Sequence, residues 1–151
     1  MRRLVPIVLL FFISVPAASA WTWPVRGAVV QAFDFDQAHP YAAGQHRGIA
    51  IAADPGTVVV APASGVISFA GTVPVSGKCL TIETAGGLAV TLTHLGSIAV
   101  GKGDPVGEGA AVGTVGPSGT AEVDVPYVHL GVREATRDQG YLDPLRFLHD
   151  R

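Results

Sequence analysis

Residues 79–95 read CLTIETAGGLAVTLTHL, and this stretch decides the fold class. Two apolar runs, Cys79–Thr84 and Leu88–Leu95, flank Ala85-Gly86-Gly87, which is typical of a hairpin turn that needs positive φ. Alternate positions in both arms are apolar, as a half-buried antiparallel pair requires: Leu80, Ile82, Leu88, Val90 and Leu92. The stretch therefore predicts an antiparallel β hairpin.

The chain outward from this hairpin continues the same pattern. Glycine and proline interrupt it every few residues, and no segment carries a helical stripe. Between Val100 and Gly119 the dipeptide Val-Gly recurs every six residues, but three copies are too few for a β-helix, so we expect short strands and tight turns there. Asp143-Pro144-Leu145 predicts a short helical turn that ends near His149. Besides the two hairpin arms, the expected strands are Gly27–Ala32, Gly48–Ala52, Val58–Ala61, Gly65–Ala70 and Val128–Arg133. The fold class is thus a mostly β, single compact antiparallel domain.

The first twenty residues predict a secretory signal. Arg2 and Arg3 precede an apolar run, and Ala18-Ser19-Ala20 gives the small-x-small pattern that signal peptidase cleaves. The apolar run is too short for a membrane-spanning helix, which needs about 20 such residues. We expect residues 1–20 to be removed and residues 21–151 to form the domain, which would be secreted or associated with the cell wall.

Composition excludes several classes of function. The 151 residues carry 10 Lys and Arg against 12 Asp and Glu, and two of the basic residues lie in the signal. With no basic stripe, the chain is not expected to bind nucleic acid or anionic lipid. Cys79 is the single cysteine, so no internal disulfide can form, and its setting favours a small buried residue.

Three of the five histidines stand at the edges of expected strands: His46, His94 and His129. His94 has the parity of Val90 and Leu92, so its ring is expected to point where theirs do. His129 alternates with its apolar neighbours and is expected to share a face with Tyr127. From the residues alone, the three histidines either share a metal site or are hydrogen-bonded imidazoles in a core or cleft. His39 and His149 are expected to be surface residues.

A set of motifs in a fixed order resembles the M23 (LytM-type) peptidase family. His46-Arg47-Gly48-Ile49-Ala50 with the following turn is similar to the His-x-Gly-x-Asp signature, and Tyr127-Val128-His129 falls on the His-x-His strand. The resemblance runs from Trp23 to Leu148 and implies a LytM-type β sandwich. The composition, rich in Ala, Gly and Val, resembles that of an actinobacterial protein. The other motifs that match, in order, are Ala63–Ile67, Thr91–Leu95, Val100–Val106, Val112-Gly113, Gly116–Gly119 and Leu142–Leu145.

The resemblance implies that His46 and His129 are zinc ligands and that His94 orients the attacking water. Two departures weaken this site: Ala50 stands where the family has the ligand Asp, and Tyr127 stands where it has a catalytic His. Loss of a charged ligand should lower metal affinity by more than the roughly 10–100-fold that a lost outer partner costs. Tyr127 can donate a hydrogen bond but is a poor acid–base group near pH 7. Zinc is therefore expected to bind weakly or not at all, and whether the protein is an enzyme stays open.

Two main functions follow as expectations. The first is a catalytically degenerate cell-wall domain that binds peptidoglycan stem or cross-bridge peptides, or regulates a cell-wall hydrolase. The alternative is an active zinc-dependent peptidoglycan endopeptidase that uses His46, His129 and His94. A biotin or lipoyl carrier built around Lys78 lacks the acidic or Met neighbours that a modified lysine needs.

Aromatic residues frame the expected groove. Trp21 and Trp23 are expected to pack on a sheet edge. One wall of the groove, or a cover for the β core, is expected from Phe33, Asp34, Phe35 and Tyr41.

Overall fold

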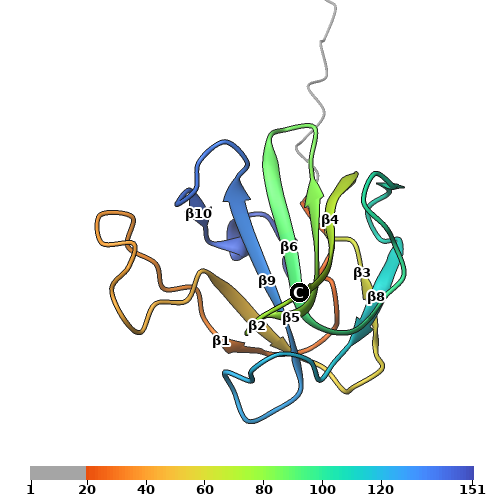
Figure 1. The fold of residues 1–151 in the computed structure, drawn as a ribbon, viewed down its shortest axis with the longest axis horizontal. Coiled ribbons are helices and arrows are strands. Elements are labelled where there is room, and N and C mark those ends of the chain that lie inside the picture. Colours follow the sequence, from red (N-terminus) through yellow and green to blue (C-terminus); the bar gives the residue numbers. More distant parts are fainter. Residues whose placement is uncertain (1–19) are drawn as a thin grey trace, which may run out of the picture.

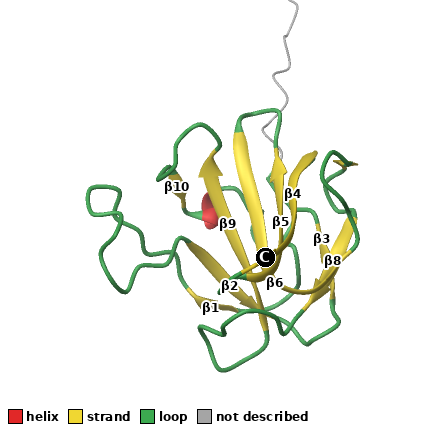
Figure 2. Ribbon diagram, in the orientation of Figure 1, coloured by secondary structure: helices red, strands yellow, loops and turns green. Residues whose placement is uncertain are grey.

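The structure, a computed structural model, describes residues 20–151. Residues 1–19 of the expected signal lie outside the described residues, and only its last residue, Ala20, lies within them. Within them the fold contains ten strands and one 3-10 helical turn (Figures 1 and 2). No helix in this part of the chain is long and apolar enough to cross a membrane. The elements are β1 (Val29–Gln31), β2 (Gly48–Ala52), β3 (Val58–Val60), β4 (Gly65–Val73), β5 (Gly77–Glu83), β6 (Leu88–Ile98), β7 (Pro105–Val106), β8 (Ala111–Val115), β9 (Tyr127–Glu134), β10 (Tyr141–Leu142) and η1 (Pro144–Arg146).

Every pairing between these strands is antiparallel, and the main sheet has the order β1-β2-β9-β6-β5-β4-β7. The long strand β6 changes partners along its length. Its first half, Leu88–Thr93, pairs with β9, and Leu95–Ile98 pairs with β8. Because β8 also pairs with β3, this switch brings a second pair of strands over the sheet and closes the core.

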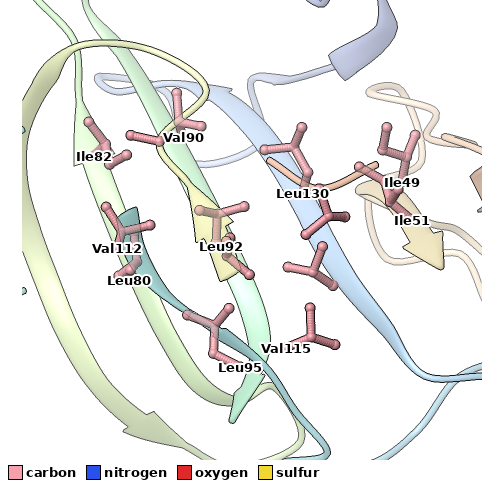
Figure 3. Close-up of a cluster of buried hydrophobic side chains, with 14 of the residues drawn as sticks. Ile49, Ile51, Leu80, Ile82, Val90, Leu92, Leu95, Val112, Val115 and Leu130 are labelled. Carbon is pink, nitrogen blue, oxygen red and sulfur yellow. The ribbon is translucent and has the colours of Figure 1, made fainter. Parts of the chain in front are cut away.

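The core confirms the expected alternation in the hairpin. Leu80, Ile82, Val90 and Leu92 are almost fully buried and meet Leu130 of β9 (Figure 3). On the same sheet β2 adds Ile49 and Ile51, and the pair β3 and β8 covers the core through Val59, Val112 and Val115. The single antiparallel β domain expected from the sequence is therefore confirmed. Each expected strand is present, although the bounds of several differ by up to three residues.

The two ends of the described chain are joined. Trp21 and Leu148 form a parallel bridge, in which the Trp21 N–H donates to the Phe147 carbonyl (2.7 Å) and His149 N–H donates to the Trp21 carbonyl (3.0 Å). The Trp23 indole N–H donates to the His149 carbonyl (2.8 Å), and the Arg151 guanidinium lies 3.6 Å from the Trp23 ring centroid. Both tryptophans also pack against the core, whereas the sequence led us to expect them on a sheet edge.

Candidate functional site

The His-x-Gly-x-Ala segment lies along β2 and the residues just before it. His46 is held by a bridge to Asp34, with N···O distances of 2.7 and 2.9 Å between the two backbones. A Cβ at Gly48 would stand 2.2 Å from the Leu130 carbonyl oxygen and 2.6 Å from Cε1 of His129. Only glycine therefore allows the His129 ring to lie over this strand.

His129 stands at the centre of a row that crosses three strands. Its register partners are Ala50 on β2 and Thr93 on β6, and directly paired residues in antiparallel strands share a face. Burial, followed by the charges of His94 and His46, lowers the pKa of His129 to about 4. At neutral pH His129 is thus an uncharged imidazole near two other histidines, the state in which an imidazole can bind a metal.

The third position of the expected metal set has no carboxylate. Ala50 is fully buried, and its methyl group is the side chain next to His129 on β2. On the other side Ala50 pairs with Gln31, whose Oε1 is buried and has no hydrogen-bond partner among residues 20–151. Within the same residues, no group of three or more His, Cys, Asp or Glu side chains is arranged to hold a metal ion. The residues present do not fit the carboxylate-containing zinc set that the resemblance implies.

His94 has both ring nitrogens engaged inside the fold. Nδ1 lies 2.8 Å from the Thr93 hydroxyl, and Nε2 lies 3.0 Å from the Thr120 carbonyl oxygen, to which it can only donate. The Thr93 hydroxyl therefore donates to Nδ1, and this fixes the tautomer. The φ of His94 is 60°, which breaks the strand alternation. The expectation that its ring points into the core beside Val90 and Leu92 is wrong, because the ring lies against Tyr127, with 4.8 Å between the centroids and 38° between the planes.

Tyr127, which stands where the resemblance implies a catalytic histidine, is buried. Its hydroxyl oxygen accepts a hydrogen bond from the Glu122 backbone N–H at 3.1 Å, which leaves its own hydrogen available to a ligand. Burial raises the pKa of the Tyr127 phenol above its ordinary value, so the group stays protonated at neutral pH. Tyr127 and His129 are two residues apart on β9 and both face the cleft, as expected from their shared parity.

Two cavities meet at His94. The first, of about 210 Å³, has a mixed lining that includes His129, Arg47, Arg133 and Tyr141, and we call it the polar cavity after these side chains. The second, of about 250 Å³, lies under the 116–127 loop and is mostly apolar, with Tyr127 in its wall. We call the two together the histidine cleft. It offers hydrogen-bond donors and an apolar recess side by side, a combination that is usual in ligand-binding sites.

Several residues of the cleft were not predicted from the sequence. Arg47 packs against both Phe35 and Tyr141, with its guanidinium carbon 5.4 and 5.6 Å from their ring centroids. Arg133 and Glu122 also line the polar cavity. No local pattern distinguishes these charges from surface residues. The pairing of β2 with β9 brings Arg47 and Arg133 together, and the 116–127 loop adds Glu122.

The aromatic rim expected before His46 is divided in the structure. Phe35 packs edge-on against Tyr141, which lines the polar cavity. Phe33 packs against the core instead. Tyr41 is 83% exposed on the loop between β1 and β2, which projects from the body of the protein (orange, left in Figure 1). None of these residues lines the two cavities described above: Phe35 contacts the cleft only through Tyr141, and Phe33 covers the core, which was the alternative expectation.

Known proteins share this sequence pattern and fold. The chain is 33% identical over 117 residues to the cell division protein DipM of Caulobacter vibrioides, with 76% of this chain and 18% of DipM covered. It is 28% identical to the murein hydrolase activator NlpD of Salmonella typhimurium, over 88% of this chain and 32% of NlpD. The chain thus spans a third or less of the length of these relatives.

A solved structure, a zinc-containing peptidase from Vibrio cholerae, superposes with a TM-score of 0.71 at 21% identity, over 85% of this chain and 40% of that one. This likeness concerns the fold alone. Residues 44–144, which include His46, His94, Tyr127 and His129, match the model of peptidase family M23. With that match over most of its length, and with the antiparallel β fold in place, the chain belongs to peptidase family M23.

Proposed function

We propose that this protein is an exported LytM-type domain that acts at the cell wall by binding, and that it does not hydrolyse peptide bonds. The observation that carries the proposal is Ala50, which is fully buried beside His129 where the family signature has a zinc ligand. Two neutral imidazoles, without an anionic donor, form a weak site for a divalent cation.

The hydrogen bonds of His94 support the same reading. A histidine that orients water in a hydrolytic reaction needs a free ring nitrogen within reach of that water. In this fold Nδ1 and Nε2 are both used, toward the Thr93 hydroxyl and the Thr120 carbonyl. His94 holds the 116–127 loop to β6 and so shapes the cleft rather than carrying a proton.

The binding partner follows from the cleft and from the relatives. Its mixture of guanidinium groups, hydroxyls and an apolar recess suits an extended peptide that carries a carboxylate. Such a ligand is either a peptidoglycan stem or cross-bridge peptide or a segment of a cell-wall hydrolase. The names of NlpD, a murein hydrolase activator, and DipM, a cell division protein, support a regulatory role at the wall.

A rescue series tests this proposal. We expect the natural protein to bind no stoichiometric zinc and to release no peptides from purified peptidoglycan. Ala50→Asp should restore zinc binding by at least about tenfold, and Ala50→Asp with Tyr127→His should add EDTA-sensitive release of peptides. Because Ala50 is fully enclosed, each variant is first checked for a native unfolding transition.

The control is Ala50→Asn, which adds similar bulk without a charge and should leave zinc affinity unchanged. If the natural protein binds zinc stoichiometrically and cleaves peptidoglycan in an EDTA-sensitive way, the binding proposal is wrong and the endopeptidase alternative holds.

A further inference from the structure

A second hollow lies away from the histidine cleft, where the joined chain ends meet the turn between β5 and β6. Its volume is about 370 Å³. The turn lies at the top of Figure 1, whereas the 116–127 loop lies at the bottom. From Leu88 to His94 the distance along β6 is roughly 20 Å, given about 3.3 Å per residue. We call this region the terminal hollow, lined by Trp21, Ser64, Thr84, Leu88, Glu108 and Phe147.

An aromatic pair forms one wall of the terminal hollow. The Trp21 and Phe147 rings stack at 4.7 Å between centroids with 23° between their planes. The parallel bridge between Trp21 and Leu148 fixes both backbones, and Leu148 is anchored in the core. The aromatic surface is therefore held in place before any ligand arrives.

Glu108 supplies a fixed acceptor beside that wall. Its Oε1 accepts a hydrogen bond from the Thr22 hydroxyl at 3.0 Å, and its backbone N–H donates to the Ser64 hydroxyl at 2.9 Å. A carboxylate has two oxygens with about four lone-pair sites, so Oε2 stays available to a donor on a ligand.

Two hydroxyls supply the complementary donors. Ser64 Oγ accepts from the Glu108 N–H, and Thr84 Oγ1 accepts from the Leu88 N–H at 3.2 Å. Since each oxygen already accepts a backbone donor, its own hydrogen is available to a group in the hollow. The terminal hollow thus presents an aromatic surface, one carboxylate acceptor and two hydroxyl donors.

The adjoining surface narrows the class of ligand. A shallow depression shares Ser64 and Thr84 with the terminal hollow and adds Val66, Val106 and a second carboxylate, Glu83. No Lys or Arg lines either depression in the described part of the chain. Anions are disfavoured by the two carboxylates, and a cationic ligand would leave both hydroxyl donors unmatched.

We propose that the terminal hollow binds a short stretch of an uncharged, N-acetylated sugar chain. One sugar ring packs on the aromatic pair, its acetamido N–H and hydroxyls donate to Glu108, and its acetamido carbonyl accepts from Ser64 or Thr84. This goes beyond the proposed function of the histidine cleft and shares only its cell-wall setting. The two surfaces would allow one protein to contact a sugar chain and a peptide at separate places.

A titration with tetra-N-acetylchitotetraose tests the proposal, followed through the two indole N–H resonances in NMR spectra. The Trp21 signal should shift with saturation. The Trp23 signal is an internal control, because its N–H is bonded to the His149 carbonyl and its ring is covered by Arg151. Glu108→Gln, which keeps an oxygen acceptor for Thr22, should weaken binding about 3- to 10-fold.

Glu122→Gln in the histidine cleft is the matched control and should leave affinity for the sugar unchanged. Ala50→Asp should also leave it unchanged, so failure of the cleft proposal and failure of this one are separate results. The inference is overturned if the sugar shifts neither indole or both equally, or if Glu108→Gln binds as well as the natural protein. It is also overturned if tetralysine, and not the sugar, shifts Trp21.

Discussion

The two halves of β6 are held in different ways. From Leu88 to Thr93 the strand forms a regular ladder with β5 and β9, and its side chains alternate between core and cleft. At His94 the backbone turns to a φ of 60°, the register with β5 and β8 shifts, and the strand changes partner. The regular half is held by burial of apolar side chains. The irregular half also buries Leu95, and its turn at His94 is fixed by hydrogen bonds between the His94 ring and both Thr93 and Thr120.

This difference shows where the fold tolerates unusual backbone. A non-glycine residue in the left-handed region costs of order 1–3 kcal/mol and persists only where the surroundings fix it. His94 is such a residue, and it lies where the two cavities of the histidine cleft meet. The regular ladder on one side of His94 helps to hold this irregular, cleft-facing backbone in place.

The largest loss of stability is expected at Gly48 on β2, which pairs with β9, the neighbour of the regular half of β6. Gly48→Val should destabilise the protein by more than about 4 kcal/mol or prevent folding, since any Cβ meets the Leu130 carbonyl and the His129 ring. Denaturant unfolding measures the change. Gly107→Ala is the control, because a Cβ there meets no atom within 4 Å and its φ is not positive, and this variant should be nearly neutral.

Shortening a buried side chain in the regular half of β6 should lower stability somewhat less. Leu92 is fully buried among the core side chains, so Leu92→Ala should lower the free energy of unfolding by about 3 kcal/mol. Chemical denaturation gives the value. A loss below about 1 kcal/mol would show that the core at this half of β6 is loosely packed.

The dependence of stability on pH tests the surroundings of His129, which pairs with Thr93 at the end of the regular half of β6. Its folded pKa of about 4 is below the unfolded value, so between pH 6.5 and 4 the unfolded chain binds more protons than the folded one. Stability should be complete above pH 6.5 and fall by roughly 3 kcal/mol as the pH drops to 4. Unfolding measured at several pH values tests this, and His129→Gln should remove most of that slope.

Glycine substitutions distinguish the two halves directly. At an ordinary strand position alanine is more stabilising than glycine by roughly 0.5–1 kcal/mol, and Ala89→Gly should show at least this loss. At His94 the order should reverse, with His94→Gly more stable than His94→Ala by about 0.5 kcal/mol, because glycine relieves the positive φ. Thermal unfolding of the three variants provides the comparison, and equal or opposite ranking at position 94 would contradict it.

The smallest change in stability is expected on the face of the regular half that points away from the core. Thr81 and Thr91 share a hydrogen bond between their hydroxyls at 3.0 Å, with both side chains partly buried. Thr91→Val should cost about 0.5 kcal/mol, the usual value of one cross-strand polar pair. A double-mutant cycle with Thr81→Val measures the coupling free energy between the two hydroxyls. A coupling near zero would mean that their hydrogen bond adds nothing to stability.

The sequence predicted the regular parts of the fold because alternation of apolar residues reports directly on burial. The arms around Ala85-Gly86-Gly87 form β5 and β6, and the short helical turn forms at Pro144–Arg146. The strands β7, β8 and β10 were not located individually, since each is short and surrounded by glycine or charged residues. Their positions depend on pairing with distant strands rather than on local pattern.

The candidate site was predicted less completely than the fold. His46, His129 and Tyr127 could be selected by motif order, and their assignment as ligands or catalytic groups stays a prediction. The direction of the His94 ring could not be predicted. An argument from alternation assumes an extended backbone, and His94 instead has a positive φ. Arg47 and Gln31 reach the site only through the register of β1, β2 and β9.

The parallel bridge between Trp21 and Leu148 has a mechanical consequence. Strands that run in the same direction and are pulled from opposite ends are loaded in shear, so their hydrogen bonds share the force and do not open one after another. Tension applied between the two ends of this domain would act first on the bonds that join Trp21 to Phe147 and His149. Stretching would therefore separate the Trp21–Phe147 stack before it reached the strands around His129.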